Sequence, residues 1–373
     1  MKLFEYQAKD AFKDAGVAVP ESVLIRDMDE LDQAIAKIGL PCVLKAQVLK
    51  GGRGKAGLVK VVKDADEARK EATRIFGAPN NAPSILVEQA VDIGRELYLS
   101  VTFDPVSATA LLIGSAEGGV DIESLAKESP EKITSVNVDI EEGLGSYHIN
   151  NLVYGMGLKG DVAKKVGKIA SALYRVFRDK DASLVEINPL FITKSGDIIA
   201  GDGKLIIDDN SLFRQPGYPL DREHFDSDVE YEAAADGIPY LRFDGDIALL
   251  CAGSGLTTAV YDLINDAGGS VATYVDFGGA NYTRAVRAME LCLETPSKAI
   301  LVVTFGTIAR ADVMAEGIVE AMKKLKPDVP IVLRIRGTNE AEAFNILKEA
   351  GLENLTDTEE AVRKAVELAR SAN

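Results

Sequence analysis

Residues 44–57 read LKAQVLKGGRGKAG, and the rest of the chain is organised around this stretch. An apolar run ends on Lys45, and a short turn then adds Lys50, Arg53 and Lys55 among glycines. Glycine lets a backbone approach a ligand closely, and successive N–H groups in such a turn form a cradle for anions. The stretch therefore predicts a polyphosphate site at the tip of a strand pair.

The glycine-rich turn is not a Walker A loop. That loop needs a glycine five positions before its Gly-Lys pair and Ser or Thr directly after it. These positions hold Leu49 and Ala56, so the sequence indicates a different nucleotide-binding architecture. A basic surface hairpin is the alternative reading, because glycine-rich turns occur wherever strands reverse.

Length and charge limit the class of protein. A chain of 373 residues exceeds one ordinary domain, so we expect two or three. The net charge of −16 argues against nucleic acid as a partner. The N-terminus does not resemble a signal peptide, and no apolar run is long enough to cross a membrane. We therefore expect a cytoplasmic protein with reduced cysteines and no membrane partner.

Residues 1–236 alternate helix and strand patterns and form the first expected domain. Helical spacing over residues 4–15 precedes the strand that carries Lys45. Further strands are expected at residues 59–62, 85–90 and 182–192. A polar, charged segment then leads to a domain boundary that we place at residues 236/237.

Residues 237–373 form the second expected domain. Short apolar runs at residues 247–252, 270–277, 299–305 and 330–335 each precede about a dozen residues of helical periodicity. This pattern predicts a doubly wound parallel sheet, which makes the chain an α/β protein. Ligands of such sheets bind beyond the carboxyl ends of the strands, where the helices begin.

Two further motifs occur in this domain. Gly253-Ser254-Gly255 lacks the third glycine of a dinucleotide fingerprint, because Thr258 stands in its place. The final helix is expected to begin with a capping box of Thr356 and Glu359.

Hard oxygen ligands accompany the predicted phosphate site. Glu186 and Asn188 lie two residues apart on a strand and therefore share a face, and Asp202 follows the returning strand. Mg²⁺ is usually held by one or two such side chains together with phosphate oxygens and water. The alternative for each residue alone is a turn. Together with Lys45, the residues favour a site for a metal nucleotide.

Two other residue types bear on catalysis. Glu88 and Glu96 flank the link between two strands, where a carboxylate could accept hydrogen bonds from a ribose or a base amine; exposed loop residues are the alternative. His148 and His224 both lie away from glycine turns that begin helices. If the reaction passes through a phosphohistidine, the histidine therefore belongs to another chain.

The motifs resemble one known family, the β subunit of ADP-forming succinyl-CoA synthetase. The resemblance covers essentially the whole chain and rests on MKLFEYQAK (1–9), GGRGKAG (51–57), EINPL (186–190), DGK (202–204) and FRQP (213–216). It implies an ATP-grasp fold followed by a flavodoxin-like CoA-ligase domain. It also implies a reaction of ATP, a small carboxylic acid and CoA that yields acyl-CoA, ADP and phosphate, which belongs to the tricarboxylic acid cycle where the acid is succinate.

The resemblance further implies cofactors, a partner and site residues. ATP with Mg²⁺ would bind this chain, and an α subunit would carry the phosphorylated histidine and most of the CoA site in a heterodimer or heterotetramer. Glu186 would be the catalytic residue facing that histidine, and a helix beginning near Gly278-Gly279 would direct its positive end at the phosphate. The implied nucleotide residues are Lys45, Gly52, Arg53, Gly54, Glu88, Val91 and Glu96. The implied metal ligands are Asn188 and Asp202, and the implied acid-binding residues are Ala252, Gly306, Thr307, Ile308 and Ala309.

Two turns depart from the family pattern. Ala252 replaces the Asn of Asn-Gly-Ala-Gly-Leu, and Thr307 replaces the second glycine of Phe-Gly-Gly-Ile-Val-Arg. Both turns are associated in the family with the acid, whereas the nucleotide motifs are intact. The contrast indicates the same reaction on succinate or on a different short acid such as sulfoacetate or malate. A regulatory subunit that binds nucleotide without catalysis is the alternative from another class.

Overall fold

The computed structural model describes residues 1–49 and 51–372, and Lys50 of the glycine-rich turn lies outside them. The chain divides into two compact units, Met1–Pro219 and Leu220–Asn373. We expected the division at residues 236/237. Residues 220–236 belong to the second unit because Ala233 is buried in its core and Asp236 forms ion pairs with Arg284 and Arg287 there.

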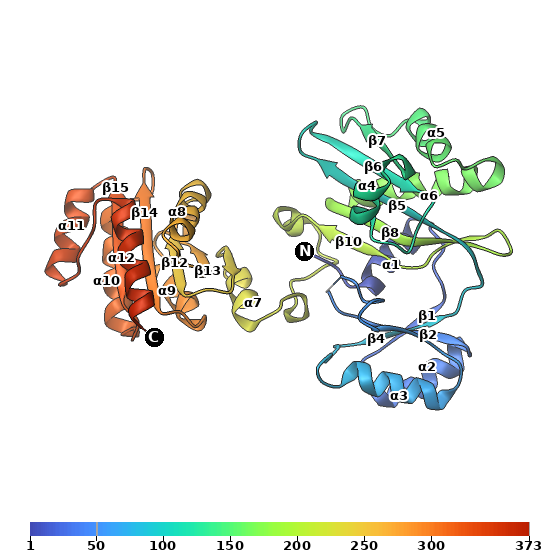
Figure 1. The fold of residues 1–373 in the computed structure, drawn as a ribbon, viewed down its shortest axis with the longest axis horizontal. Coiled ribbons are helices and arrows are strands. Elements are labelled where there is room, and N and C mark those ends of the chain that lie inside the picture. Colours follow the sequence, from blue (N-terminus) through green and yellow to red (C-terminus); the bar gives the residue numbers. More distant parts are fainter. Residues whose placement is uncertain (50, 373) are drawn as a thin grey trace. The chain divides into compact units, whose positions relative to one another are not determined.

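The first unit contains a four-stranded antiparallel sheet in the order β1-β4-β2-β3. Figure 1 shows α2 and α3 together on one face of it. Lys45 of β2 pairs with Val59 of β3, so the glycine-rich turn joins the ends of this strand pair as predicted. The elements are α1 (Glu5–Asp14), β1 (Ser22–Ile25), η1 (Met28–Glu30), α2 (Leu31–Ile38), β2 (Cys42–Ala46), β3 (Val59–Val62), α3 (Ala65–Phe76) and β4 (Ile85–Gln89).

The second sheet of this unit has the order β10-β8-β5-β6-β7, with β9 paired to β8. The amphipathic α6 covers it and buries residues at helical spacing, among them Val166, Ala170, Leu173 and Phe177. The elements are β5 (Ile93–Asp104), β6 (Thr109–Ser115), α4 (Ile122–Glu128), η2 (Pro130–Lys132), β7 (Ile133–Val138), α5 (Ser146–Gly155), α6 (Gly160–Asp179), β8 (Ala182–Thr193), β9 (Ile198–Ala200), β10 (Lys204–Ile207) and η3 (Asp209–Arg214).

The helix α1 connects the two sheets of the first unit. Its Phe12 is fully buried in the core of the six-stranded sheet. On the same helix, Glu5 and Lys9 reach Lys45 of β2 and Glu88 of β4. The helix therefore ties the strand that carries Lys45 to the sheet that carries Glu186.

The second unit contains a five-stranded sheet in the order β11-β13-β12-β14-β15. All its strands are parallel except the edge strand β11, and the parallel strands follow the flavodoxin-like order 2-1-3-4. The predicted doubly wound fold is thereby confirmed. The elements are η4 (Arg222–His224), α7 (Asp228–Ala235), β11 (Tyr240–Arg242), β12 (Ile247–Cys251), α8 (Ser254–Asp266), β13 (Val271–Asp276), η5 (Gly279–Asn281), α9 (Ala285–Glu294), β14 (Ala299–Gly306), α10 (Ala311–Leu325), β15 (Ile331–Gly337), α11 (Glu340–Glu349) and α12 (Thr358–Ser371).

Two expected helix starts in this unit are wrong. The helix α12 is capped by Asp357, whose carboxylate accepts a hydrogen bond from the Glu360 amide, so the cap lies one residue beyond Thr356. The helix expected near Gly278-Gly279 is a single 3₁₀ turn, η5, and the regular helix α9 begins only at Ala285.

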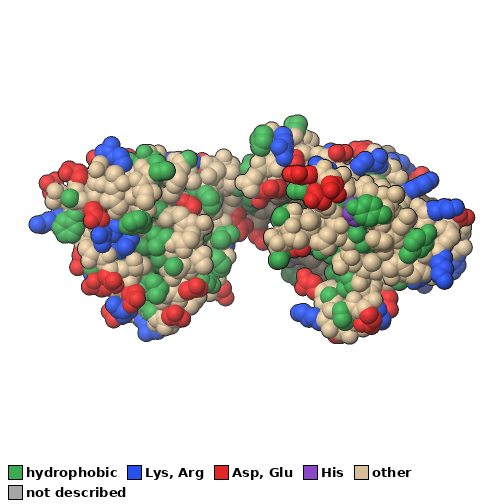
Figure 2. Space-filling model, turned by 90° about the horizontal axis from the view of Figure 1, so that it is seen from above, with side chains coloured by type: hydrophobic (Ala, Val, Ile, Leu, Met, Phe, Trp, Pro, Cys, Tyr) green, Lys and Arg blue, Asp and Glu red, His purple; other side chains and the backbone are tan. Residues whose placement is uncertain are grey.

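Acidic and basic side chains are interspersed over the face shown in Figure 2. Within residues 1–49 and 51–372, no helix combines the length and the apolar character that crossing a bilayer requires.

Candidate functional site

One ionic network lies between the two sheets of the first unit. Its members are Glu5, Lys9, Lys45, Arg53, Glu88 and Asp202. Three of these side chains are cations and three are carboxylates, so the network is neutral as a whole. Charges are tolerated in a protein interior when they are paired in this way, because an unpaired buried charge loses its hydration without compensation.

Lys45 occupies the centre of the network and is only 7% exposed. Its Nζ lies 3.0 Å from Glu5 Oε1, 2.6 Å from Glu88 Oε1 and 2.6 Å from the Gly201 carbonyl oxygen. Burial acts to lower the pKa of Lys45, but Glu5 and Glu88 outweigh it and raise the pKa above its usual value. Lys45 is therefore a buried ammonium whose charge is stabilised by the carboxylates around it.

Glu5 and Glu88 are the carboxylates that hold Lys45. Burial alone would raise the pKa of Glu5, but Lys45, Lys9 and Arg53 together keep it well below its usual value. Glu88 is 2% exposed and faces Lys45 with one oxygen and Lys9 with the other. We expected Glu88 to accept hydrogen bonds from a ribose or base; in this structure its carboxylate accepts them from lysines.

Arg53 joins the glycine-rich turn to the predicted metal ligand. Its Nη2 donates a hydrogen bond to Asp202 Oδ1 at 2.7 Å, and its Nη1 forms an ion pair with Glu5 Oε2 at 2.7 Å. Nη1 also donates to the Ala46 carbonyl at 3.2 Å, which folds the turn back onto the end of β2. The turn and Asp202 are therefore in direct contact, as a shared nucleotide and metal site requires.

The glycine-rich turn leaves its backbone accessible. Gly52 has φ +73°, a conformation that favours glycine, and both Gly52 and Gly54 are exposed. Apart from the adjacent residues, no atom of the described residues 1–49 and 51–372 lies within 4 Å of the position that a Cβ would take at either glycine. The Leu58 amide donates to the Arg53 carbonyl at 2.8 Å and closes the turn.

Glu186 lies on β8 between two neighbouring strands. It pairs with Ser100 of β5 and with Lys204 of β10. The Tyr98 hydroxyl donates a hydrogen bond to its Oε2 at 3.2 Å. Burial raises the pKa of Glu186, and Lys204 and Tyr98 partly offset this effect. A half-buried carboxylate with a raised pKa at the edge of an ionic site is a candidate for catalysis.

Asn188 and Glu96 meet at a segment that the sequence analysis did not single out. The Gly119 amide donates to Asn188 Oδ1 at 2.8 Å, and Asn188 Nδ2 donates to the Val120 carbonyl at 3.0 Å. A Cβ at Gly119 would lie 2.1 Å from a carboxylate oxygen of Glu96. The segment 118–120 therefore contacts both Asn188, the predicted metal ligand, and Glu96, the predicted nucleotide residue. Its two adjacent glycines are the sequence signal that could have revealed it.

The residues fit a magnesium nucleotide by their chemistry. Asp202 offers a carboxylate and Asn188 an amide oxygen, which are hard donors, and Lys45 and Arg53 are the nearby cations. In the described part of the chain, no group of three or more His, Cys, Asp or Glu side chains could hold a metal by itself. Phosphate oxygens and water would complete the shell of a Mg²⁺ ion bound here.

The histidines of this chain lie outside the ionic network. His148 is buried, and its Nδ1 accepts a hydrogen bond from the Gly145 amide at 2.9 Å, so it holds the start of α5. His224 belongs to η4 of the second unit. The ion pairs that define the network join lysine and arginine side chains to carboxylates.

The predicted acid-binding residues of the second unit follow β12 and β14. Ala252 follows β12, and a Cβ at Gly278 would come within 3.2 Å of its Cα, so the turns after β12 and β13 are in contact. Gly306 ends β14, where a Cβ would lie 1.9 Å from the Ala309 carbonyl oxygen. The chain needs glycine at position 306 to make this turn.

The turn after β14 is fixed by the turn after β15. Thr338 donates from its amide to the Gly306 carbonyl at 2.8 Å and from its hydroxyl to the Thr307 carbonyl at 2.7 Å. The side chains of Thr307 and Ile308 remain exposed. The backbone of this turn is thus held by hydrogen bonds, while the side chain of Thr307, which departs from the family pattern, and that of Ile308 are available to a ligand.

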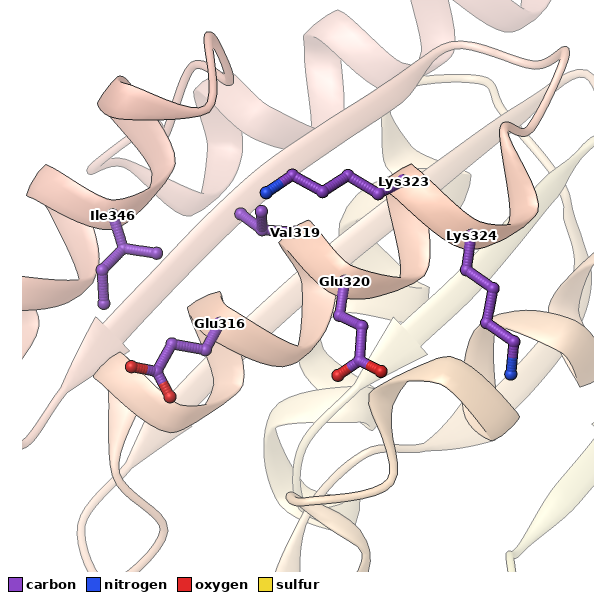
Figure 3. A pocket seen from close by; sticks show the side chains of 6 residues that line it. All are labelled: Glu316, Val319, Glu320, Lys323, Lys324 and Ile346. Atoms are coloured by element: carbon purple, nitrogen blue, oxygen red, sulfur yellow. The ribbon is translucent and has the colours of Figure 1, made fainter.

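A separate hollow of about 590 Å³ opens between α10 and α11. Figure 3 shows its side chains, a mixture of carboxylates, ammonium groups and aliphatic groups. They are Glu316, Val319, Glu320, Lys323, Lys324 and Ile346. None of them belongs to the turns that follow the strands, so this hollow is distinct from the predicted acid site.

Family models and known proteins match along the chain. The model of the ATP-grasp domain matches residues 2–192, and the model of the CoA-ligase domain matches residues 250–368. An ADP-forming sulfoacetate-CoA ligase subunit, SauC of Bilophila wadsworthia, is 68% identical over 99% of each chain. The succinate–CoA ligase [ADP-forming] subunit beta of Ignicoccus hospitalis is 43% identical over 100% of each chain.

A solved structure shares the fold. The ATP citrate lyase from Methanothrix soehngenii, in complex with citrate and coenzyme A, superposes with a TM-score of 0.74 at 21% identity over 99% of each chain.

We predict that Tyr98→Phe raises the pKa of Glu186 further. The variant loses the hydroxyl that donates to the charged carboxylate, while burial stays the same. A raised pKa of Glu186 in the folded state means that the folded protein is favoured when this carboxyl is protonated. The free energy of unfolding of Tyr98→Phe should therefore fall further below that of wild type as the pH rises through the Glu186 pKa. Carboxyl ¹³C NMR titration measures the shift, and Tyr154→Phe, which removes an exposed hydroxyl, is the matched control. An unchanged or lowered Glu186 pKa in Tyr98→Phe would contradict the assignment.

Proposed function

The chain belongs to the β-subunit family of ADP-forming acid–CoA ligases, and from that premise we propose that it serves a ligase whose acid is sulfoacetate. The observation that carries this proposal is the 68% identity, along the whole chain, to a subunit named for sulfoacetate, against 43% to a subunit named for succinate. The reaction joins the acid to CoA at the expense of ATP and releases ADP.

The chemistry of the two acids agrees with the altered turns. Sulfoacetate carries a tetrahedral sulfonate with three oxygens where succinate carries a planar carboxylate with two. Ala252 removes the amide side chain of the family pattern and leaves more space, and the exposed Thr307 hydroxyl adds a hydrogen-bond donor. We propose that these residues, with the backbone at Gly306, Ile308 and Ala309, contact the sulfonate.

We propose that the first unit binds magnesium ATP. Lys45 and Arg53 would neutralise phosphate charge, the amides at Gly52 and Gly54 would approach the phosphates, and Asn188 and Asp202 would hold Mg²⁺. A bound Mg²⁺ supplies charge neutralisation at the phosphate oxygens. Phosphoryl transfer requires mainly positioning and neutralisation of charge, which these side chains provide. Val91 and Glu96 would flank the nucleoside.

We also propose a partner subunit that carries the phosphorylated histidine and most of the CoA site. The relatives are named as subunits, which implies an assembly of more than one chain. His148 Nδ1 accepts a hydrogen bond from the Gly145 amide at the start of α5, so this nitrogen is not free to act as a nucleophile. In this proposal Glu186, whose pKa is raised by burial, would accept a proton from the partner's histidine.

The acid is tested with the reconstituted enzyme. Co-expressed with its CoA-binding partner subunit, the chain should release ADP from ATP in a CoA-dependent manner. We expect kcat/KM for sulfoacetate to exceed that for succinate and malate at least about tenfold, or ~1.4 kcal/mol, because the acid site is adapted to a sulfonate. Succinate turned over as fast as sulfoacetate would overturn the choice of acid. Nucleotide binding without turnover of any acid would favour a regulatory subunit.

The acid-binding turns are tested by restoring the family pattern. We expect Ala252→Asn combined with Thr307→Gly to shift the ratio of kcat/KM for succinate over sulfoacetate upward by about tenfold, since the amide donor returns and the added hydroxyl is lost. The KM for ATP serves as the internal control, because both substituted residues belong to the second unit and the proposed nucleotide site belongs to the first. A ratio that stays constant would mean that other residues select the acid.

The nucleotide site is tested by removing its charges. We expect Lys45→Ala and Asp202→Ala each to lower the rate of ADP formation at least about 10²-fold, the size of effect that follows loss of a charge contact in phosphoryl transfer. Lys60→Ala, which removes an exposed ammonium from the paired strand β3, is the control and should retain the wild-type rate. Normal rates in the Lys45 and Asp202 variants would place the nucleotide elsewhere.

A further inference from the structure

Lys9 duplicates every contact that Lys45 makes. Its Nζ lies 2.8 Å from Glu5 Oε1, donates to the Gly201 carbonyl at 3.0 Å and forms an ion pair with Glu88 Oε2. Lys45 Nζ contacts the same carbonyl and the same two carboxylates. The proposed nucleotide site uses only one of these two lysines, because Lys9 lies on α1 and is 3% exposed.

All three N–H donors of the Lys45 ammonium have partners in this structure. An ammonium has three N–H donors, and three oxygen atoms surround its Nζ within 3.0 Å. A phosphate oxygen can therefore bind Lys45 only if at least one of the present partners gives up its contact. Glu5 would keep cations, because Lys9 and Arg53 also pair with it. Glu88 would keep one only through Lys9, since its ion pairs in the described residues are with Lys9 and Lys45.

We propose that Lys9 is a positioning residue that takes over the counter-ion role at Glu88 when Lys45 turns to the nucleotide. Lys9 does not contact the phosphates itself. It lowers the free energy needed to separate Lys45 from Glu88. Without Lys9, the buried Glu88 carboxylate would be left without a cation and would lose its hydration without compensation. The inference rests on the proposed nucleotide site and is independent of which acid the enzyme uses.

The test is a double-mutant cycle on nucleotide affinity. We expect Lys9→Gln to weaken the binding of Mg-ATP at least tenfold by isothermal titration calorimetry, because Lys45 is then the only cation left for Glu88. In the Glu88→Gln background no counter-ion is needed, so adding Lys9→Gln should change the affinity less than twofold. Calorimetry reports binding without turnover, and thermal unfolding verifies that each variant is folded.

The control is Lys13→Gln, which makes the same change of charge on an exposed residue of the same helix. Its affinity for Mg-ATP should equal that of wild type. If Lys9→Gln alone does not fold, the comparison of Glu88→Gln with the double variant still tests the role, because both carry a neutral side chain at position 88 and a loss of affinity above twofold between them would contradict it.

The outcomes separate the inference from the site on which it rests. Wild-type affinity in Lys9→Gln, or an equal loss of affinity from Lys9→Gln in both backgrounds, would overturn the role of Lys9 as stand-in counter-ion. Wild-type protein that binds no Mg-ATP, or Lys45→Ala that binds it normally, would instead overturn the proposed nucleotide site.

Discussion

The structure of the first unit depends on charge neutrality in its ionic network. Glu5 contacts Lys9, Lys45 and Arg53 while it is 4% exposed. Removing one partner from a buried pair typically costs ~3–5 kcal/mol, because the other charge is left without compensation. Helix α1, the strand with Lys45 and the glycine-rich turn are therefore fixed to one another by electrostatics, and Phe12 of the same helix adds apolar packing in the core of the six-stranded sheet.

Sequence patterns predicted the elements better than their connections. The strands that carry Lys45 and Glu186 and the parallel strands of the second unit follow from apolar runs and helical periodicity, because period and burial are local properties. The start of α12 was misplaced by one residue, since Asp357 and Thr356 are both good caps and only the backbone selects between them. Contacts between distant segments, such as Gly119 with Asn188, carry no local pattern.

The sequence also predicted only part of the candidate site. Lys45, Arg53 and Asp202 were found from glycine spacing and residue type, and the structure brings them together. Glu5 and Lys9 were missed as site residues because, in the sequence, charges four residues apart on a helix look like an exposed pair. Their burial became visible only when α1 was seen to lie against both sheets. The role of Glu88 also changed, since its partners are lysines from two other segments.

Neutrality also links the metal to the nucleotide. In this structure Arg53 and Asp202 satisfy each other, so a cation at Asp202 would compete with Arg53, and a phosphate at Arg53 would compete with Asp202. Either ligand alone would break this pair and leave one of its charges partly uncompensated. Magnesium and triphosphate together would supply both partners, the cation for Asp202 and the anion for Arg53. Under the proposed ligand set, this pairing favours the binding of the metal nucleotide as one unit over the binding of either component.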